Sequence, residues 1–391
     1  MNAGPRKHPI LFGGLLLTSE MLISCGGGGA TENSGCQGCP AAAETLYVSN
    51  SGQIQVFPIN PSTGALGVPV SVTASPAVVD MIATPDSHFL YASDFQSDQV
   101  DAFSIDGHTE ALTAVLGSPY RFGNLTRSAG GLGMDAAGRF LYATDIQAFQ
   151  VPGFTINGSN GSLTAVPGSP FTTGFYPGRT VVSPSTKFVE VVDLGLGLGG
   201  ISSFTINTSN GFLTPGPSGP LTFVSSAGAA DMVMHSSGKF LCISQGFTAI
   251  DSGVAAFTLD QTTGFPTQIG GTFLAGLAPR RMVADPATKF LYTANTGDGT
   301  VSAFSIDSMT GALTPVMGSP FPTGISAPPA GALILFDLAI DPLGQFLYVS
   351  NPQTNSIAWF RISATTGTLS PLGATPLTGS GPGAMVAVKL Q

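Results

Sequence analysis

The chain has 391 residues and a formal net charge of −9, with 43% hydrophobic and only 9% charged residues. This balance excludes a disordered chain, and the 13 Lys and Arg include no basic run after residue 7 that would suit nucleic acid. The 52 Gly and 30 Pro favour turns and short strands over helices.

The first 25 residues have the features of a bacterial export signal. Arg6 and Lys7 precede an apolar stretch over residues 10–17, and Leu-Ile-Ser-Cys follows at 22–25. This tetrapeptide resembles a lipobox, in which the cysteine after the cut carries a lipid. We expect a lipoprotein signal peptide over 1–25, a lipid on Cys25 and a flexible Gly-rich tether over 26–43. An ordinary secretory signal is the alternative, and both place the protein outside the cytoplasm, in the periplasm or on the cell surface.

From residue 44 onward the sequence repeats seven times. The units begin at residues 45, 89, 140, 188, 240, 290 and 346, and Phe-Leu-Tyr-Val-Ser-Asn at 346–351 is one clear copy. In each unit a second apolar strand ends in Phe, and in six units a Thr-Gly or Asn-Gly turn follows, where Gly supplies the positive φ of a tight hairpin. A short third strand and an apolar fourth strand complete the period. Periods near 40–50 residues with this content predict an all-β propeller of four-stranded blades.

The two ends of the repeat are complementary. The chain enters at the second strand of a blade, near Leu46, and leaves on a first strand over residues 385–390. We therefore expect the C-terminal strand to be the inner strand of the N-terminal blade, which hides two open sheet edges. Residues 44–391 are predicted to form one seven-bladed β-propeller.

The repeated segments resemble those of the lactonase-like and YVTN-repeat propellers, through Phe-Leu-Tyr-Val-Ser-Asn after Asp-Pro-x-Gly and Thr-Gly-x-Leu-Thr downstream. The resemblance implies hydrolysis or cycloisomerisation of a lactone, as in 6-phosphogluconolactonase-like members. Such propellers often carry Pro-Arg-His on an inner strand and Asn-Glu after the next. Here the matching residues are Pro279-Arg280-Arg281 and Asn295-Thr296. Arg280 matches and could bind an anion, whereas Arg281 and Thr296 cannot act as a base near neutral pH.

Nine positions before the first residue of the repeats, five of the seven ring positions are charged. We expect these positions to share one rim of the central channel, where Arg would grip a carboxylate or phosphate. The alternative is that neighbouring Asp and Arg pair and plug the channel. With Ala384 from the closing strand, the ring reads Asp80, Gly131, Arg179, Asp231, Arg281 and Asp337. The predicted ligand-binding residues are Asp80, Arg179, Asp231, Arg280, Arg281 and Asp337.

A second ring of polar residues ends the Phe-Leu-Tyr-type strands. We expect these side chains to cap the following turns. No dense acidic loop or cofactor motif is present, so we expect neither a metal nor a cofactor. The ring comprises Asn50, Asp94, Asp145, Asp193, Gln245, Asn295 and Asn351.

Two replacements of the repeated Tyr stand out. Glu190 should face Val181 by hairpin register, diagonal to Arg179, so we expect a salt bridge to Arg179 or, alternatively, a locally exposed strand. Cys242 should be a buried hydrophobic residue. Cys36 and Cys39 lie in the predicted tether, where a disulfide is favoured over a zinc site.

Three functions are compatible with these features. The first is a monomeric cell-envelope lipoprotein that binds a small anionic or sugar-like ligand, or a protein, at the channel rim without catalysis. The second is a lactone hydrolase or cycloisomerase in which Arg179, Arg280 and Arg281 bind the acid group and Asp80, Asp231 or Asp337 acts as base. The third is a structural surface module.

Overall fold

In the computed structural model, the described residues are 1, 44–123, 129–174, 176–194, 199–216, 221–223, 228–246, 252–326, 336–377, 379 and 381–390. The chain divides into residues 1–41 and residues 42–391. The predicted signal peptide, tether, Cys25, Cys36 and Cys39 lie outside the described residues. Among the residues that are described, no helix is long and apolar enough to span a membrane.

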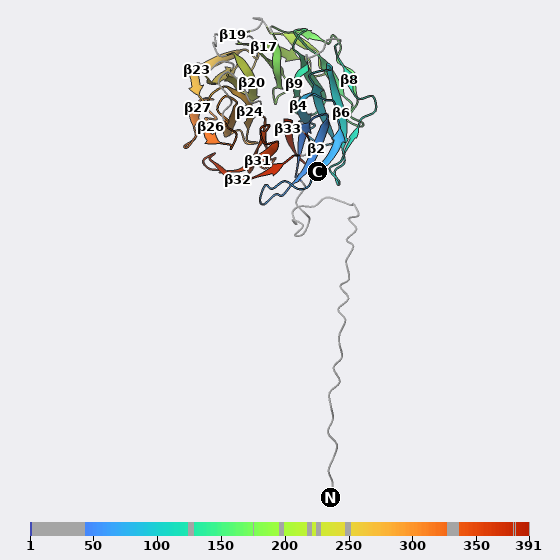
Figure 1. The fold of residues 1–391 in the computed structure, drawn as a ribbon. Helices are drawn as coiled ribbons and strands as arrows, with labels where there is room; N and C mark the ends of the chain where they lie inside the picture. The colour runs from blue at the N-terminus through green and yellow to red at the C-terminus, as the bar shows by residue number, and fades with distance from the viewer. Residues whose placement is uncertain are drawn as a thin grey trace. The chain divides into compact units, whose positions relative to one another are not determined.

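Residues 44–390 contain seven antiparallel sheets arranged as the blades of a ring (Figure 1). This arrangement confirms the predicted all-β, seven-bladed propeller, and the inner strands face the centre of the ring. The inner strands of blades 1 to 7 are β4 (Val78–Ala83), β9 (Ala129–Met134), β15 (Pro177–Val182), β20 (Ala229–Met234), β24 (Pro279–Ala284), β29 (Leu338–Ile340) and β33 (Pro382–Lys389). The second strands are β5 (Phe89–Asp94), β10 (Phe140–Asp145), β16 (Phe188–Asp193), β21 (Phe240–Gln245), β25 (Phe290–Asn295), β30 (Phe346–Asn351) and β1 (Glu44–Asn50).

The third and outer strands complete each blade, and in several blades the outer strand is divided into two short pieces. The third strands are β6 (Gln99–Ile105), β11 (Gln150–Val151) with β12 (Gly153–Ile156), β17 (Gly199–Ile206), β22 (Gly253–Leu259), β26 (Thr300–Ile306), β31 (Ser356–Ile362) and β2 (Gln53–Ile59). The outer strands are β7 (Leu112–Ala114), β8 (Tyr120–Arg121), β13 (Leu163–Ala165), β14 (Phe171–Thr172), β18 (Leu213–Pro215), β19 (Leu221–Phe223), β23 (Pro266–Leu274), β27 (Leu313–Pro315), β28 (Phe321–Pro322), β32 (Leu369–Pro376) and β3 (Val70–Thr73).

The ring is closed by the two ends of the repeat, as predicted. Strand β33 pairs antiparallel with β1, with Leu46 opposite Ala387 and Val48 opposite Met385. Blade 7 therefore contains one strand from the C-terminus and three from the N-terminus. The pairing covers the edge of β1 that would otherwise be open to association with another chain.

In five of the seven blades the repeated Tyr joins the blade to the next one. The fully buried Tyr91 hydroxyl donates to the Gly161 carbonyl in the hairpin turn of the following blade, at 2.8 Å. Gly161 has a φ of +72°, and a Cβ there would lie 2.4 Å from the Phe89 ring, so the turn can accept only Gly. Four further Tyr hydroxyls make the equivalent bond to the next turn: Tyr47 to Glu110, Tyr142 to Gly211, Tyr292 to Gly367 and Tyr348 to Gly64.

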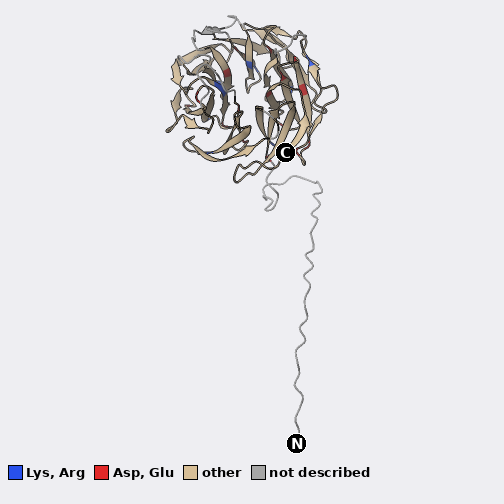
Figure 2. Ribbon diagram, in the orientation of Figure 1, with Lys and Arg blue, Asp and Glu red and all other residues tan. Residues whose placement is uncertain are grey.

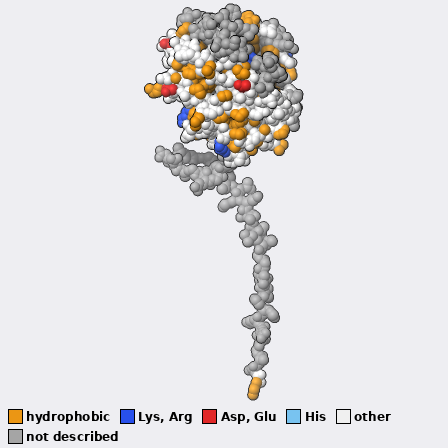
Figure 3. Space-filling view, turned by 60° about the vertical axis from the view of Figure 1, so that its left-hand side comes forward, with side chains coloured by type: hydrophobic (Ala, Val, Ile, Leu, Met, Phe, Trp, Pro, Cys, Tyr) orange, Lys and Arg blue, Asp and Glu red, His pale blue; other side chains and the backbone are white. Residues whose placement is uncertain are grey.

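The apolar core is divided among the interfaces between blades. The five repeated Tyr residues and Phe57, Phe257, Phe304 and Phe346 are among the largest fully buried side chains. On the outside, apolar side chains form small groups on a surface with few charges (Figure 3). Exposed examples such as Leu116, Met309 and Met317 are single residues of turns, which is ordinary for a folded surface.

Candidate active site

The inner strands bring the predicted ring of charges to the centre of the propeller. Figure 2 shows that charged residues are sparse and that several of them lie on strands around this centre. Most inner strands are irregular near the ring position, for example between Val78 and Asp80 and between Pro279 and Met282. These bulges turn the ring side chains toward the centre instead of into the packed interface.

The three Asp residues of the ring each tie their blade to the following blade. The Asp80 carboxylate accepts the Leu132 backbone N–H at 2.7 Å, and Asp231 accepts that of Met282 at 2.8 Å. Asp337, just before β29, accepts that of Met385 at 2.9 Å. Three ring positions thus have a structural function besides any function in binding.

Arg179 closes one side of the ring. Its Nη1 lies 2.6 Å from Asp80 Oδ1 and its Nε lies 3.4 Å from Asp231 Oδ1, although Asp80 is two blades away. The intervening ring residue is Gly131, where a Cβ would lie 3.0 Å from the Arg179 Cδ and 2.8 Å from its Cα. The absence of a side chain at Gly131 therefore lets Arg179 cross blade 2. These three charges are arranged as in the pairing alternative, in which Asp and Arg plug the channel.

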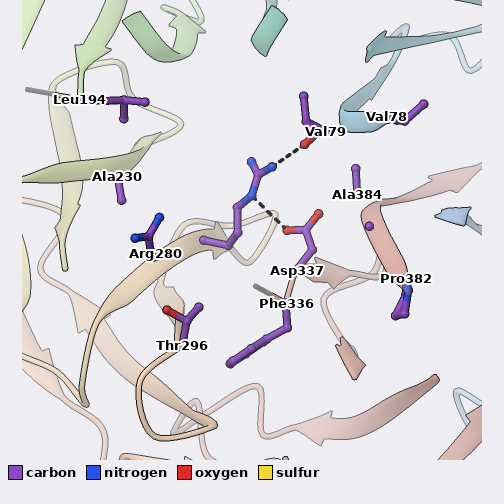
Figure 4. Close-up of a pocket in the computed structure, with 12 residues that line it drawn as sticks. Val78, Val79, Leu194, Ala230, Arg280, Thr296, Phe336, Asp337, Pro382 and Ala384 are labelled. Carbon is purple, nitrogen blue, oxygen red and sulfur yellow. Dashed lines mark hydrogen bonds and ion pairs between the residues drawn. The ribbon is translucent and has the colours of Figure 1, made fainter. Parts of the chain in front are cut away.

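Arg281 and Asp337 form a looser pair on the other side. Arg281 Nε is 3.9 Å from Asp337 Oδ1, and the Arg281 guanidinium also donates to the Val79 carbonyl across the ring (Figure 4). Burial raises the pKa of the Asp337 carboxyl, and the charge of Arg281 is the largest effect that opposes this rise. The Asp337 side chain is 15% exposed, compared with 6% for Asp80 and 3% for Asp231.

A cavity of about 310 Å³ adjoins this pair. Figure 4 shows Arg280, Asp337 and Thr296 around it, together with apolar side chains from several blades. Asp337 is the one carboxylate among its described lining residues. The polar side chains are Arg280, Arg281, Thr296 and Asp337, and the other residues are Val78, Val79, Leu194, Ala230, Phe336, Pro382, Gly383 and Ala384.

Arg280 and Thr296 occupy the two positions identified from the lactonase-like motif. Desolvation lowers the pKa of the Arg280 guanidinium, and the Ser244 hydroxyl holds the Arg280 backbone by donating to its carbonyl at 2.6 Å. Thr296 is buried, and its hydroxyl donates to the Ala278 carbonyl at 3.0 Å. The structure therefore brings Arg280, Arg281 and Asp337 to one cavity and leaves Asp80, Arg179 and Asp231 outside its lining.

Leu194 and Phe336 line the cavity and were not identified from the sequence. Leu194 directly follows the second-ring residue Asp193, as Thr296 follows Asn295. The position after the second ring is therefore the signal that could have located Leu194. Phe336 lies ten residues before Phe346, as Arg280 lies ten residues before Phe290, so the position before the charged ring is the signal that could have located it.

The second polar ring behaves only partly as expected. Turn capping is confirmed for Asp94, Asp145 and Asn351, which accept backbone N–H groups of Gln96, Ala148 and Gln353. It is wrong for Asn295, whose amide donates to the hydroxyls of Thr300 and Ser302 on the neighbouring strand instead. Residues 195–198 and 247–251, in the turns after Asp193 and Gln245, lie outside the described residues. The Asp193 and Gln245 side chains accept hydrogen bonds from the Ser202 and Thr272 hydroxyls. Burial raises the pKa of Asp193 to about 7, and the hydrogen bond from Ser202 opposes this rise.

The expected salt bridge between Glu190 and Arg179 is wrong, and so is the exposed strand. Glu190 is opposite Val181, as predicted, but its side chain is fully buried and its Oε2 accepts a hydrogen bond from the Ser203 hydroxyl at 2.5 Å. Arg179 lies within the irregular part of β15, between Pro177 and Thr180, and turns toward Asp80 and Asp231. Burial holds the pKa of Glu190 well above its usual range.

The remaining candidate residues lie outside the cavity lining. Cys242 is buried, as predicted, and burial raises the pKa of its thiol to about 12. His88 pairs with Asp86 at 2.9 Å, and His235 packs edge-on against Phe240. Within the described part of the chain, no group of three or more His, Cys, Asp and Glu could hold a metal ion.

Comparison with known proteins agrees with the geometry. The chain matches the family model described as lactonase, 7-bladed β-propeller, over residues 41–222, 132–326 and 319–387. It is 31% identical to the 6-phosphogluconolactonase of Pectobacterium carotovorum over 108 residues, which are 27% of this chain and 31% of that relative. The alignment thus spans about a third of the curated relative.

Two solved structures share the fold over most of their length. The periplasmic gluconolactonase PpgL of Pseudomonas aeruginosa superposes with a TM-score of 0.74 at 16% identity, over 90% of this chain and 100% of that one. A presumptive 6-phosphogluconolactonase of Bacteroides fragilis gives a TM-score of 0.69 at 22% identity, over 91% and 100%. At these identities the likeness establishes the propeller fold alone.

Proposed function

The chain belongs to the lactonase family of seven-bladed β-propellers, and from this premise we propose that it hydrolyses a lactone in the cavity beside Arg280, Arg281 and Asp337. The observation that carries the proposal is the single described carboxylate in the lining, which is 15% exposed, has a raised pKa and lies 3.9 Å from the Arg281 guanidinium. The names of the curated relative and of the Pseudomonas structure support the same reaction class.

Asp337 is the base in this proposal. Its carboxylate accepts a proton from a water molecule, and the water oxygen adds to the lactone carbonyl carbon. The oxyanion that forms is stabilised by a guanidinium group of Arg281 or Arg280. The ring C–O bond then breaks, and the ring oxygen recovers the proton from Asp337, so one water is consumed and one hydroxy acid is released. The raised pKa of Asp337 suits this exchange.

The position of Asp337 is fixed by the fold. Its Oδ1 accepts the Leu338 backbone N–H and its Oδ2 accepts that of Met385, both at 2.9 Å. Two backbone donors hold the carboxylate at the cavity wall without supplying a full charge that would remove its basicity. This rigid placement is what a general base needs.

The test is an assay of the purified propeller with glucono-δ-lactone, its 6-phosphate and simple γ- and δ-lactones. We expect at least one lactone to be hydrolysed faster than in buffer, and the rate to fall in Asp337→Asn and Arg281→Gln. Hydrolysis of none, or hydrolysis unchanged by both substitutions, contradicts the proposal. Calorimetric binding without turnover would instead favour the non-catalytic binding function.

We also propose export and lipidation at Cys25, from the apolar stretch and lipobox of the N-terminus. Lipidation would hold the cavity in an extracytoplasmic compartment. The test is metabolic labelling with a fatty acid in a bacterial host, where Cys25→Ser should lose the label and move to the soluble fraction. An unlabelled parent protein contradicts this proposal.

A further inference from the structure

We propose that the far mouth of the central channel binds the alkyl chain of a single-chain aliphatic carboxylate. The far mouth is the end of the channel at which the inner strands finish, whereas the cavity proposed for the lactone lies where they begin. The inference adds a second binding site and does not depend on the proposed hydrolysis. Three features carry it: partly exposed apolar walls, a charged inner end that disfavours an anion, and lysines around the opening.

The walls of the far mouth are apolar in every blade. The second and third residues after each ring position have no polar side chain, as with Val181 and Val182 after Arg179. All of them except Gly133 and Ala339 are partly exposed, although the residues directly before and after these pairs are buried in all seven blades. The inner strands that carry them surround the centre of the ring (Figure 1). An apolar lining that stays exposed over this extent is typical of a binding site.

Two adjoining cavities occupy this mouth. The first, of about 430 Å³, is lined by inner strands of blades 1 to 5 and includes Met134, Met234 and Val283. The second, of about 640 Å³, lies against β33 and shares Ile82 with the first. Methionine side chains are flexible and adapt to apolar ligands of variable shape.

The depth of the mouth suits a chain of medium length. From Arg179 to Ser183, the first buried residue beyond the apolar pair, the wall is roughly 13 Å long, because a strand advances about 3.3 Å per residue. With C–C bonds of about 1.5 Å, an extended alkyl chain of about ten carbons has this length.

The charged ring closes the inner end of the mouth and orients the ligand. Arg179 lines the first cavity and lies 2.6 Å from Asp80 and 3.4 Å from Asp231. Since two carboxylates already surround one guanidinium, a third carboxylate would be repelled there. The anionic head of the ligand therefore stays at the opening, in contact with water, and the alkyl chain enters first.

Lysines surround the opening. Lys187, Lys239 and Lys289 directly precede the second strands of blades 3, 4 and 5, whose inner strands line the first cavity. All three are exposed, and none forms an ion pair with a described carboxylate. An anionic head at the opening would thus be near ammonium groups whose charge is not matched by a salt bridge.

The carboxylates of this face do not offset the three lysines. Asp285, the one carboxylate among the described residues that line the first cavity, is buried and accepts the Phe290 backbone N–H at 2.6 Å. Asp86, Glu44 and Glu110 belong to blades 1 and 7 and not to the three blades with the lysines. Five further Asp residues in turns on this face accept backbone N–H groups: Asp106, Asp135, Asp260, Asp307 and Asp341.

The position of the apolar walls favours a single chain over a membrane surface. The walls lie inside the channel, beyond the turns that contain Pro286, Thr288 and Lys289. A flat bilayer would meet these turns without reaching the walls, whereas one alkyl chain can pass between them.

Titration calorimetry with sodium hexanoate, octanoate and decanoate, each below its micelle concentration, tests the apolar walls. We expect Kd to decrease about fourfold with each added methylene group, the usual gain from burying one. 1-Octanol and octyltrimethylammonium test the charge, and both should bind more weakly than octanoate. No binding of decanoate, an affinity independent of chain length, or tighter binding of octyltrimethylammonium than of octanoate overturns the inference.

Met234→Gln tests the first cavity directly. It places an amide against the apolar wall and should weaken decanoate binding by about tenfold or more. Met317→Gln is the matched control, because Met317 is 85% exposed in an outer turn and is absent from the described cavity linings. It should keep the parent affinity. Equal losses in the two variants overturn the inference, and Val283→Thr replaces Met234→Gln if the latter does not fold.

The lysines are tested by combining Lys239→Gln with Lys289→Gln. The double variant should bind octanoate about fivefold more weakly or worse, because each lysine near an anionic group contributes roughly that factor. Binding of 1-octanol should not change. An unchanged affinity for octanoate would show that the lysines do not hold the head group, which contradicts the proposed orientation.

Two further measurements separate this site from its alternatives. Arg281→Gln alters the cavity proposed for the lactone and should leave decanoate binding unchanged. Loss of binding in Arg281→Gln but not in Met234→Gln would place the carboxylate in that cavity and overturn the inference. Sedimentation with phosphatidylglycerol vesicles tests the membrane alternative, and binding to vesicles without binding of decanoate would also overturn it.

Discussion

The two sides of the central ring use the same strand position for opposite purposes. Arg179 and Arg281 are equivalent ring residues on β15 and β24, and each is near a ring Asp. Arg179 reaches two carboxylates because Gly131 leaves its path open, and the three charges close that side. Arg281 has one distant carboxylate and a backbone carbonyl, and a cavity adjoins it. Where an Arg lies close to two Asp residues, as on the Arg179 side, the charges pair within the protein. Where the pair is more distant, as on the Arg281 side, the charged groups remain beside a cavity that a ligand can enter.

The largest effect should follow from Asp337→Asn, which removes the proposed base from the side of the ring that adjoins the cavity. The hydrolysis rate should fall about 10²–10⁴-fold, the usual contribution of a general base. The parent rate should increase with pH as Asp337 loses its proton, at a pH above the ordinary Asp range because burial raises its pKa. Steady-state kinetics across pH measures both effects.

Asp231→Asn is the matched control for that substitution. Asp231 caps the Met282 N–H as Asp337 caps that of Met385, but it is absent from the described cavity lining. It should lose stability and keep most of the activity of the folded protein. Equal activity losses in both variants would assign Asp337 a purely structural function.

Arg179→Met should have the next largest effect, on stability. It leaves Asp80 and Asp231 buried without their cation, and breaking such a buried pair costs about 3–5 kcal/mol. Arg281→Met should cost less than half as much, because it removes one distant, more exposed pair. Urea unfolding of both variants measures the difference. Equal losses of unfolding free energy in the two variants would mean that Arg179 and Arg281 are equally well paired, which contradicts the difference between the two sides of the ring.

Gly131→Ala tests whether the lack of a side chain at residue 131 is what lets Arg179 reach Asp80. A Cβ at Gly131 would lie 2.8 Å from the Arg179 Cα and 3.0 Å from the Gly178 carbonyl, both backbone atoms that cannot move aside easily. Overpacking of this kind costs about 1–3 kcal/mol. Gly271→Ala in β23 is the control, since a Cβ there meets nothing within 4 Å. Thermal unfolding should separate the two, and an unperturbed Gly131→Ala would remove the steric explanation for the reach of Arg179.

The sequence predicted the fold well and the site only in outline. Seven units, four strands per blade and the pairing of β1 with β33 follow from period and strand order, which are local properties. The ring residues follow from the same spacing. The spacing does not predict which of these residues pair, because Arg179 meets Asp80 across an entire blade through a gap left by Gly131. That contact depends on three inner strands at once, and no spacing along the chain encodes it.

Glu190 shows the same limit at the interface between blades. It occupies the position at which five other blades have a Tyr that donates to the next hairpin turn. Its own next turn contains Gly264, where a Cβ would lie 3.2 Å from Glu190 Oε1. The carboxyl thus lies where a neutral hydroxyl lies elsewhere, and its pKa is raised by burial. A protonated acid is the form that suits such a position, since an ionised carboxylate would be buried without a cation.

Glu190→Gln should therefore have the smallest effect on stability, and it should stabilise the protein where the other substitutions destabilise it. A carboxyl with a raised pKa in the folded chain stabilises it fully only below its unfolded pKa, near 4.5, and loses this contribution as pH rises toward the folded pKa. Gln is neutral at every pH, so the variant should gain on the parent as pH increases, by about 1 kcal/mol near neutrality. Urea unfolding between about pH 4 and 8 measures the gain. Tyr142→Phe, which loses the hydroxyl bond to Gly211, should show a loss that is independent of pH over this range. If the difference in free energy of unfolding between the parent and Glu190→Gln stays constant with pH, the pKa of Glu190 is the same in the folded and unfolded chain. Its burial would then not disfavour the ionised carboxylate.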